Sequence, residues 1–204
     1  MPVIEVVVAA PVDTVWKALR DKEEIRQWHG WDFDGLDAEV DHIYFTDFVE
    51  EDRTLALGGG DRFSLTPSGS GTLITLDRAP LGGNPELDAY HDAITEGWTT
   101  FLQQLRFALE RQPGAVRRTL QFDGDFPDLT VPDARYTADL VGEQVSGEVW
   151  FRSANQVGVT VDSWGEGLLV VVGEPSPMVV LSTYGLDGST FADLETRWAK
   201  RFAG

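Results

Sequence analysis

Residues 7–28, VVAAPVDTVWKALRDKEEIRQW, hold the pattern that decides the fold of the first half of the chain. Pro11 stands where a helix can begin, because the N–H that proline lacks is not needed in a first helical turn. Asp21 can cap a second short helix, and Glu24 lies three residues later, where its side chain can reach back to the cap. The run VIEVVV at residues 3–8, β-branched apart from Glu5, predicts a strand, and residues 11–28 predict two short helices after it. The apolar residues of the first helix recur at three- and four-residue steps: Val12, Val15, Trp16 and Leu19.

A second decisive stretch is HDAITEGWTTFLQQLRFALE at residues 91–110. Apolar residues recur at helical spacing through it, which predicts a long helix that opens after Asn84-Pro85 and stops at Pro113-Gly114. Gly97 inside this helix costs about 1 kcal/mol relative to alanine and is a point at which the helix can divide.

The segment between these stretches, residues 38–78, is rich in β-formers and is punctuated by turn residues. Its runs predict an antiparallel meander of short strands. We count EVDHIYFTDFVE, residues 39–50, as the first of these strands, and we interpret Gly58-Gly59-Gly60 as a hairpin turn rather than a phosphate-binding loop, because a strand and not a helix follows it.

The second half of the chain ends in the same way as the first half, with a series of strands followed by one tryptophan-bearing helix. The final helix should start near Ser189, with Phe191, Leu194, Trp198 and Phe202 on one side. The six strand-like runs are residues 116–124, 134–141, 147–153, 156–164, 167–173 and 178–185. The sequence thus predicts an α+β fold with a first unit over 1–112 and a second over 113–204.

The order of strand, two short helices, meander and long helix resembles the helix-grip fold of the START-like (SRPBCC) superfamily. Residues 7–28 look like the opening of proteins similar to the C-terminal domain of the activator of Hsp90 ATPase, and residues 91–110 look like their last helix. The resemblance covers residues 1–112, whereas residues 113–204 match only in the order of elements and are interpreted as a reduced unit without the two short helices. The matching positions are Pro11, Val15, Trp16, Leu19, Trp28, Glu96, Gly97, Trp98, Leu102 and Leu105.

This resemblance implies a cavity between the sheet and the long helix, of the kind that holds sterols, lipids or polyketides. The residues expected to line it come from the meander or the segment before it and from the long helix. For each of them the alternative is packed core, because protein interiors are close-packed and hold few voids. The six candidates are Trp31, Tyr44, Phe63, Trp98, Leu102 and Leu105.

The charge balance restricts the partners. The chain carries 16 Lys and Arg against 34 Asp and Glu, a formal net charge of −18. The negative electrostatic field of such a chain repels polyanions, so we expect no nucleic-acid partner and no attraction to acidic lipid surfaces. It favours a neutral or cationic apolar ligand over an anionic one.

The absence of cysteine from the 204 residues excludes disulfides and thiolate metal sites and favours a reducing cytoplasm. The longest apolar stretch, residues 167–181, is interrupted by Glu174 and two prolines, and a spanning helix needs about 20 apolar residues. We therefore expect a cytoplasmic protein with no membrane span.

The histidines suggest little chemistry, because His29, His42 and His91 lie apart and lack the spacing that places two imidazoles on one metal. Asp88 precedes His91 by three residues and can orient its ring; the alternative is an exposed histidine on a solvated helix face. We assign no catalytic residue, metal or cofactor.

Three functions stay open from the sequence. The first is a carrier or sensor of a small apolar molecule. The second is a protein-interaction module, either a chaperone partner or a homodimeric scaffold. The third is a polyketide-cyclase-like enzyme, which works largely by holding its substrate in position. Binding is favoured over catalysis, and fold resemblance alone cannot separate the three.

Overall fold

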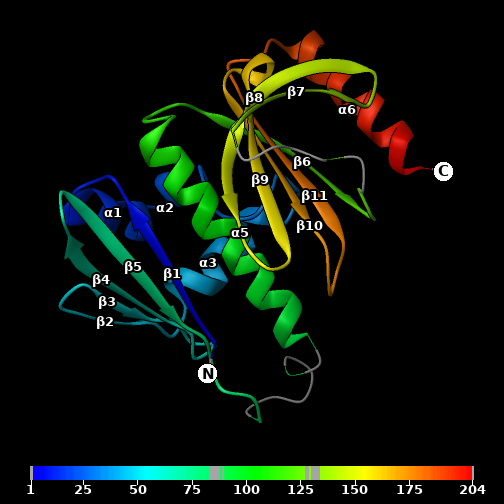
Figure 1. The fold of residues 1–204 in the computed structure, drawn as a ribbon. Helices are drawn as coiled ribbons and strands as arrows, with labels where there is room; N and C mark the ends of the chain where they lie inside the picture. Colours follow the sequence, from blue (N-terminus) through cyan, green and yellow to red (C-terminus); the bar gives the residue numbers. More distant parts are fainter. Residues whose placement is uncertain (1, 83–87, 89, 127–128, 130–133, 204) are drawn as a thin grey trace. The chain divides into compact units, whose positions relative to one another are not determined.

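The computed structural model describes residues 2–82, 88, 90–126, 129 and 134–203. The chain divides into two units, Met1–Gly114 and Ala115–Gly204 (Figure 1). Each unit combines one antiparallel sheet with a long helix that follows the last strand. The predicted α+β class and the helix-grip order of elements are thereby confirmed. No helix in the described part of the chain has the length and apolar character that crossing a bilayer requires.

The sheet of the first unit has, within the described residues, five antiparallel strands in the order β1-β5-β4-β3-β2. Its residues alternate between the two faces, as Val6 and Val8 show by being buried while Val3 and Val7 are about half exposed. The strands are β1 (Val3–Val8), β2 (Val49–Glu51), β3 (Thr54–Ala56), β4 (Arg62–Ser68) and β5 (Gly71–Asp77).

The two predicted short helices are α1 (Val12–Arg20) and α2 (Lys22–Ile25). Asp21 caps α2 as expected, since its Oδ1 accepts hydrogen bonds from the backbone N–H groups of Glu23 at 3.0 Å and Glu24 at 3.4 Å. The expected return bond from Glu24 is wrong, because the Glu24 carboxylate accepts from Lys17 Nζ at 2.6 Å instead. The cap therefore works in one direction only.

A third helix, α3 (Leu36–Phe45), corrects the strand expected over residues 39–50. Leu36, Val40 and Tyr44 are its buried residues, and their four-residue spacing forms one helical stripe against the core. The strand propensity of Ile43, Tyr44 and Phe45 is outweighed because strand propensity largely reflects packing context. The meander itself starts only at β2.

The long helix α5 (His91–Glu110) is continuous through Gly97. The expected start of this helix near residue 86 lies outside the described residues. Leu102 and Leu105 on α5 are fully buried, in one cluster with Val8 of β1 and Ile74 of β5. The core of the first unit therefore lies between the sheet and α5, and α1, α2 and α3 add residues to it.

The second unit has six strands among its described residues, in the order β6-β11-β10-β9-β8-β7. The predicted run over 147–153 starts earlier, at Glu143, and the run over 156–164 ends in the 3-10 turn η1 (Asp162–Trp164). The described residues of this unit include no counterpart of α1 and α2. The strands are β6 (Arg117–Asp123), β7 (Arg135–Leu140), β8 (Glu143–Arg152), β9 (Gln156–Val161), β10 (Gly167–Val172) and β11 (Met178–Tyr184).

The final helix α6 (Gly188–Phe202) buries Phe191, Leu194 and Trp198, as its sequence period predicts. Asp187 is its N-cap: the carboxylate accepts from Ser189 Oγ at 2.6 Å and from the Thr190 backbone N–H at 2.9 Å. These hydrogen bonds lower the pKa of Asp187 from 3.8 to about 2, and the bond from Ser189 has the largest effect.

This cap predicts a pH-dependent contribution to stability. Because the pKa of Asp187 is lowered by folding, its stabilising effect is present above the unfolded value and is lost as the pH falls from about 4 to about 2. Asp187→Ala should therefore lower the urea midpoint above that range and have little effect below it. Asp187→Asn keeps an acceptor oxygen and should therefore lower the urea midpoint by a smaller amount. A midpoint difference that stays constant down to the acid end of the range would contradict a role for the carboxylate charge.

Candidate functional site

A pocket of about 560 Å³ opens in the first unit between α3, the turn from β3 to β4, the end of β5 and the start of α5. Its size is typical of small-molecule sites, which span roughly 300–1,000 Å³. Six apolar side chains line it, together with polar and titratable groups. The apolar residues are Ile43, Leu57, Ala79, Pro80, Ile94 and Trp98, and the polar residues are His42, Thr46, Asp47, Asp61, Arg78, Asp88 and His91.

The glycine turn predicted from the sequence forms one rim of this pocket. Leu57 and Asp61 close the turn, with the Leu57 N–H donating to the Asp61 carbonyl at 2.8 Å. Gly60 adopts a φ of +93°, which side-chain-bearing residues avoid. The turn carries Gly58 and Gly59 to the pocket and places Asp61 directly behind them.

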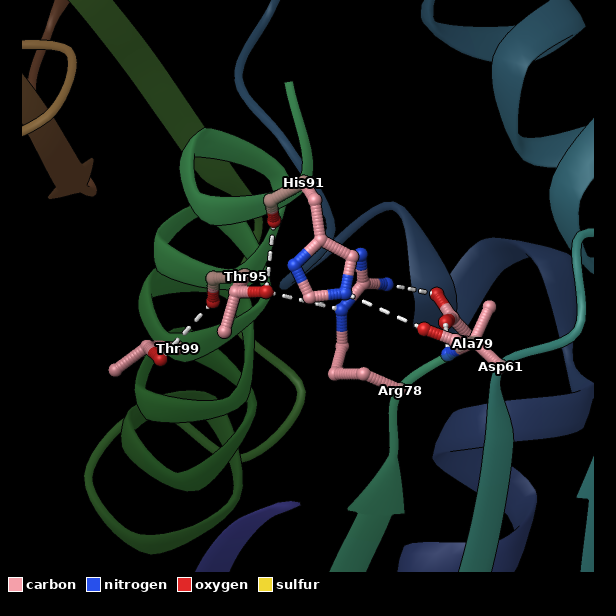
Figure 2. Close-up of polar contacts among 6 residues, drawn as sticks. All are labelled: Asp61, Arg78, Ala79, His91, Thr95 and Thr99. Atoms are coloured by element: carbon pink, nitrogen blue, oxygen red, sulfur yellow. Dashed lines mark hydrogen bonds and ion pairs between the residues drawn. The ribbon is translucent and has the colours of Figure 1, made fainter. Parts of the chain in front are cut away.

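Asp61 and Arg78 form a buried ion pair in the wall of the pocket, and Figure 2 shows its contacts. Arg78 Nη1 donates to Asp61 Oδ2, and the Ala79 backbone N–H donates to Asp61 Oδ1 at 2.8 Å. Only 4% of Arg78 and 8% of Asp61 is exposed. Burial lowers the pKa of Arg78, and the negative charge of Asp61 opposes that effect. The pair therefore holds a charged guanidinium while adding no net charge to the pocket.

The Thr95 hydroxyl connects this pair to α5. Arg78 Nε donates to Thr95 Oγ1 at 3.3 Å, and the same hydroxyl donates to the His91 carbonyl at 2.8 Å (Figure 2). Arg78 Nη2, the other terminal nitrogen, has no hydrogen-bond partner among the described residues. Arg78 itself is one of the residues that line the pocket.

His91 differs from both sequence interpretations. It is 8% exposed, so it is not a surface histidine. Asp88 does not orient it, because the Asp88 carboxylate accepts from the Gly82 backbone N–H at 2.8 Å. His91 Nε2 instead lies 3.3 Å from the Ala79 carbonyl, and Nδ1 lies 3.4 Å from Asp92 Oδ1. Each ring nitrogen faces an acceptor, so the imidazole is a hydrogen-bond donor in this wall.

A second buried polar cluster lies behind the pocket wall. The Tyr44 hydroxyl is 2.9 Å from His29 Nδ1, and His29 Nε2 is 3.2 Å from Glu39 Oε1. Burial raises the pKa of Tyr44 well above 10.0, and the negative charges of Glu39 and Asp61 add to the shift. Tyr44 therefore keeps its proton. In the tautomer whose Nε2–H points at Glu39, a neutral His29 leaves Nδ1 to accept from the Tyr44 hydroxyl. This cluster joins α3 to the segment after α2.

The structure places the six candidate cavity residues in different surroundings. Trp98 lines the pocket. Trp31 is half-buried, and its ring meets Phe101 edge-on with centroids 6.2 Å apart. The remaining four are fully buried in the core cluster and do not line the pocket: Tyr44, Phe63, Leu102 and Leu105.

Sequence reasoning missed the ion pair, although a signal for it exists. Strands β4 and β5 are joined by a two-residue turn, and their register pairs Arg62 with Asp77. Asp61 and Arg78 are the next two residues along each strand, so they lie opposite one another beyond the last ladder pair. Counting back from the turn at Gly69 and Ser70 predicts this pairing.

No protein-family model matches the chain, and neither does any curated protein. Among solved structures, the crystal structure of DynU16, a protein of the dynemicin biosynthetic locus, is 18% identical with a TM-score of 0.39, covering 97% of this chain and 93% of that one. BexL, a di-domain ARO/CYC protein from the BE-7585A biosynthetic pathway, is 12% identical with a TM-score of 0.38, covering 98% of this chain and 92% of that one. At these identities and TM-scores the likeness says nothing about ligand or reaction.

The buried ion pair leads to a prediction about stability. Arg78→Met leaves Asp61 buried without its cation and should lower the free energy of unfolding by about 3–5 kcal/mol. Adding Asp61→Asn should recover part of that loss, because the uncompensated charge is then gone. The control is the exposed ion pair between Lys22 and Asp41. Lys22→Met should lower the free energy of unfolding by no more than about 1 kcal/mol. Urea unfolding measures all three, and equal losses for Arg78→Met and Lys22→Met would contradict a buried pair.

Proposed function

We propose that the first unit binds a small, largely apolar molecule in the pocket beside Trp98. The observation that carries the proposal is the combination of an apolar wall with a buried guanidinium whose Nη2 has no partner among the described residues. Ligand sites commonly pair an apolar lining with a few polar groups that fix orientation.

The state of Arg78 indicates which polar group a ligand would present. Asp61 already balances the charge of Arg78, so the pair offers a hydrogen bond without a net positive charge. An anionic ligand would gain little from this balanced pair and would meet the field of the −18 chain. An uncharged oxygen, such as a carbonyl or hydroxyl group, suits Nη2 better.

The apolar lining sets the scale of affinity. Burying about 300 Å² of apolar ligand surface contributes roughly 7 kcal/mol at about 25 cal/mol per Å², before the cost of association. That cost leaves micromolar binding as the expected limit. Trp98 is the member of the predicted set that takes part in this proposal, because Leu102 and Leu105 lie in the core farther along α5.

The proposal is tested by filling the pocket. Ile94 lines it and is only partly buried, so Ile94→Trp should occupy its volume without disrupting the core. Calorimetric titration with a fatty acid, a sterol, a flavonoid and a cationic amphiphile should show micromolar binding of at least one neutral or cationic compound. Ile94→Trp should weaken that binding at least about tenfold, which corresponds to about 1.4 kcal/mol.

The matched control is Val7→Trp, which adds the same side chain on the exposed face of β1, outside this pocket. It should leave binding unchanged. Binding that survives Ile94→Trp, or a preference for the fatty acid over the neutral and cationic compounds, would refute the proposed site.

A further inference from the structure

We propose that the ligand of this pocket is a cationic amphiphile, whose protonated amine lies at Asp47 and Asp88 while its apolar body lies against Trp98. This inference rests on the proposed function and adds the chemical class of the ligand. Its basis is the difference between the three carboxylates that line the pocket.

Asp61 is compensated, because it accepts from Arg78 and from the Ala79 backbone N–H. Asp88 lines the pocket, and among the described residues its carboxylate accepts one hydrogen bond, from the neutral Gly82 backbone N–H at 2.8 Å. Asp47 has no hydrogen-bond or ion-pair partner within the described residues. Within the described part of the chain, the pocket lining therefore carries two carboxylates that no lysine or arginine neutralises, and Arg78 is its one lysine or arginine.

The backbone holds Asp47 in place. A Cβ atom at Gly58 would lie 3.1 Å from the Asp47 Cβ, so the segment just after α3 packs closely on the glycine turn. Asp47 itself has a φ of 53°, a left-handed conformation that aspartate and asparagine tolerate better than most residues. The backbone and Cβ of Asp47 are thus held at the rim, and its carboxylate has no partner among the described residues.

The apolar wall favours an organic cation over a bare metal ion. Ile43, Leu57 and Ile94 line the same pocket as Asp47 and Asp88, and a hydrated metal ion would gain nothing from these apolar side chains. An amine on an apolar body uses both features, because its charged head stays at the exposed rim while the body leaves water. Arg78 Nη2 provides an additional donor for any oxygen on that body.

The test compares three probes with the same ring and substitution position: naphthylmethylamine, naphthalenemethanol and naphthoate. Calorimetric titration of the full chain near neutral pH should rank the amine first, the alcohol second and the carboxylate last. Two partly exposed carboxylates should give the amine a roughly tenfold advantage over the alcohol. Raising the ionic strength from about 0.05 M to about 0.5 M should reduce that advantage and leave binding of the alcohol unchanged.

Asp47→Asn and Asp88→Asn should each lower the advantage of the amine about threefold without weakening the alcohol. Asp52→Asn is the matched control: Asp52 is also exposed and also has a positive φ, of 41°, but it lies outside the pocket and should change nothing.

The possible results separate the two proposals. If the alcohol binds as tightly as the amine, or if both asparagine variants keep the full preference for the amine, the cationic ligand is refuted and the apolar site stands. If none of the three probes binds to the wild-type chain, both proposals fail. A preference that persists at high ionic strength also counts against a charge-based origin.

Discussion

The ion pair between Asp61 and Arg78 joins the parts of the first unit that form the pocket. It connects the start of β4 to the end of β5, and through Thr95 it reaches the first turn of α5. Two charges can remain buried here because each has several partners: a backbone N–H for the carboxylate and a hydroxyl for the guanidinium. The rim carboxylates and the apolar wall are arranged around this neutral centre, so the electrostatic character of the pocket depends on it.

Much of the fold follows from sequence period and capping. The segments now seen as α1, α5 and α6 have apolar residues at helical spacing, and Asp21 is a cap in the sequence as in the structure. The helix α3 escaped prediction because Ile43, Tyr44 and Phe45 are good strand formers whose helical arrangement is decided by burial of Leu36, Val40 and Tyr44 against the core. Local propensity is a weak signal when tertiary packing opposes it.

The site was less accessible to sequence reasoning than the fold. Tyr44, Leu102 and Trp98 all have the apolar character expected of a cavity wall, and all three lie in the core cluster. Only three-dimensional packing shows that Trp98 also lines the pocket. Ile43 and Ile94 line the same pocket from α3 and α5, which no pattern within either segment indicates. The pairing of Asp61 with Arg78 was within reach, since hairpin register follows from turn length.

That register has a consequence for recognising related proteins. A side chain in a β-strand changes face with every one-residue shift, so a β4–β5 turn longer or shorter by one residue would separate Asp61 from Arg78. A chain that keeps this ion pair should therefore keep the two-residue turn as well. A distant homologue that keeps an aspartate before one strand and an arginine after the next, at equal distances from a two-residue turn, would be expected to share this pocket even where the rest of its sequence has diverged.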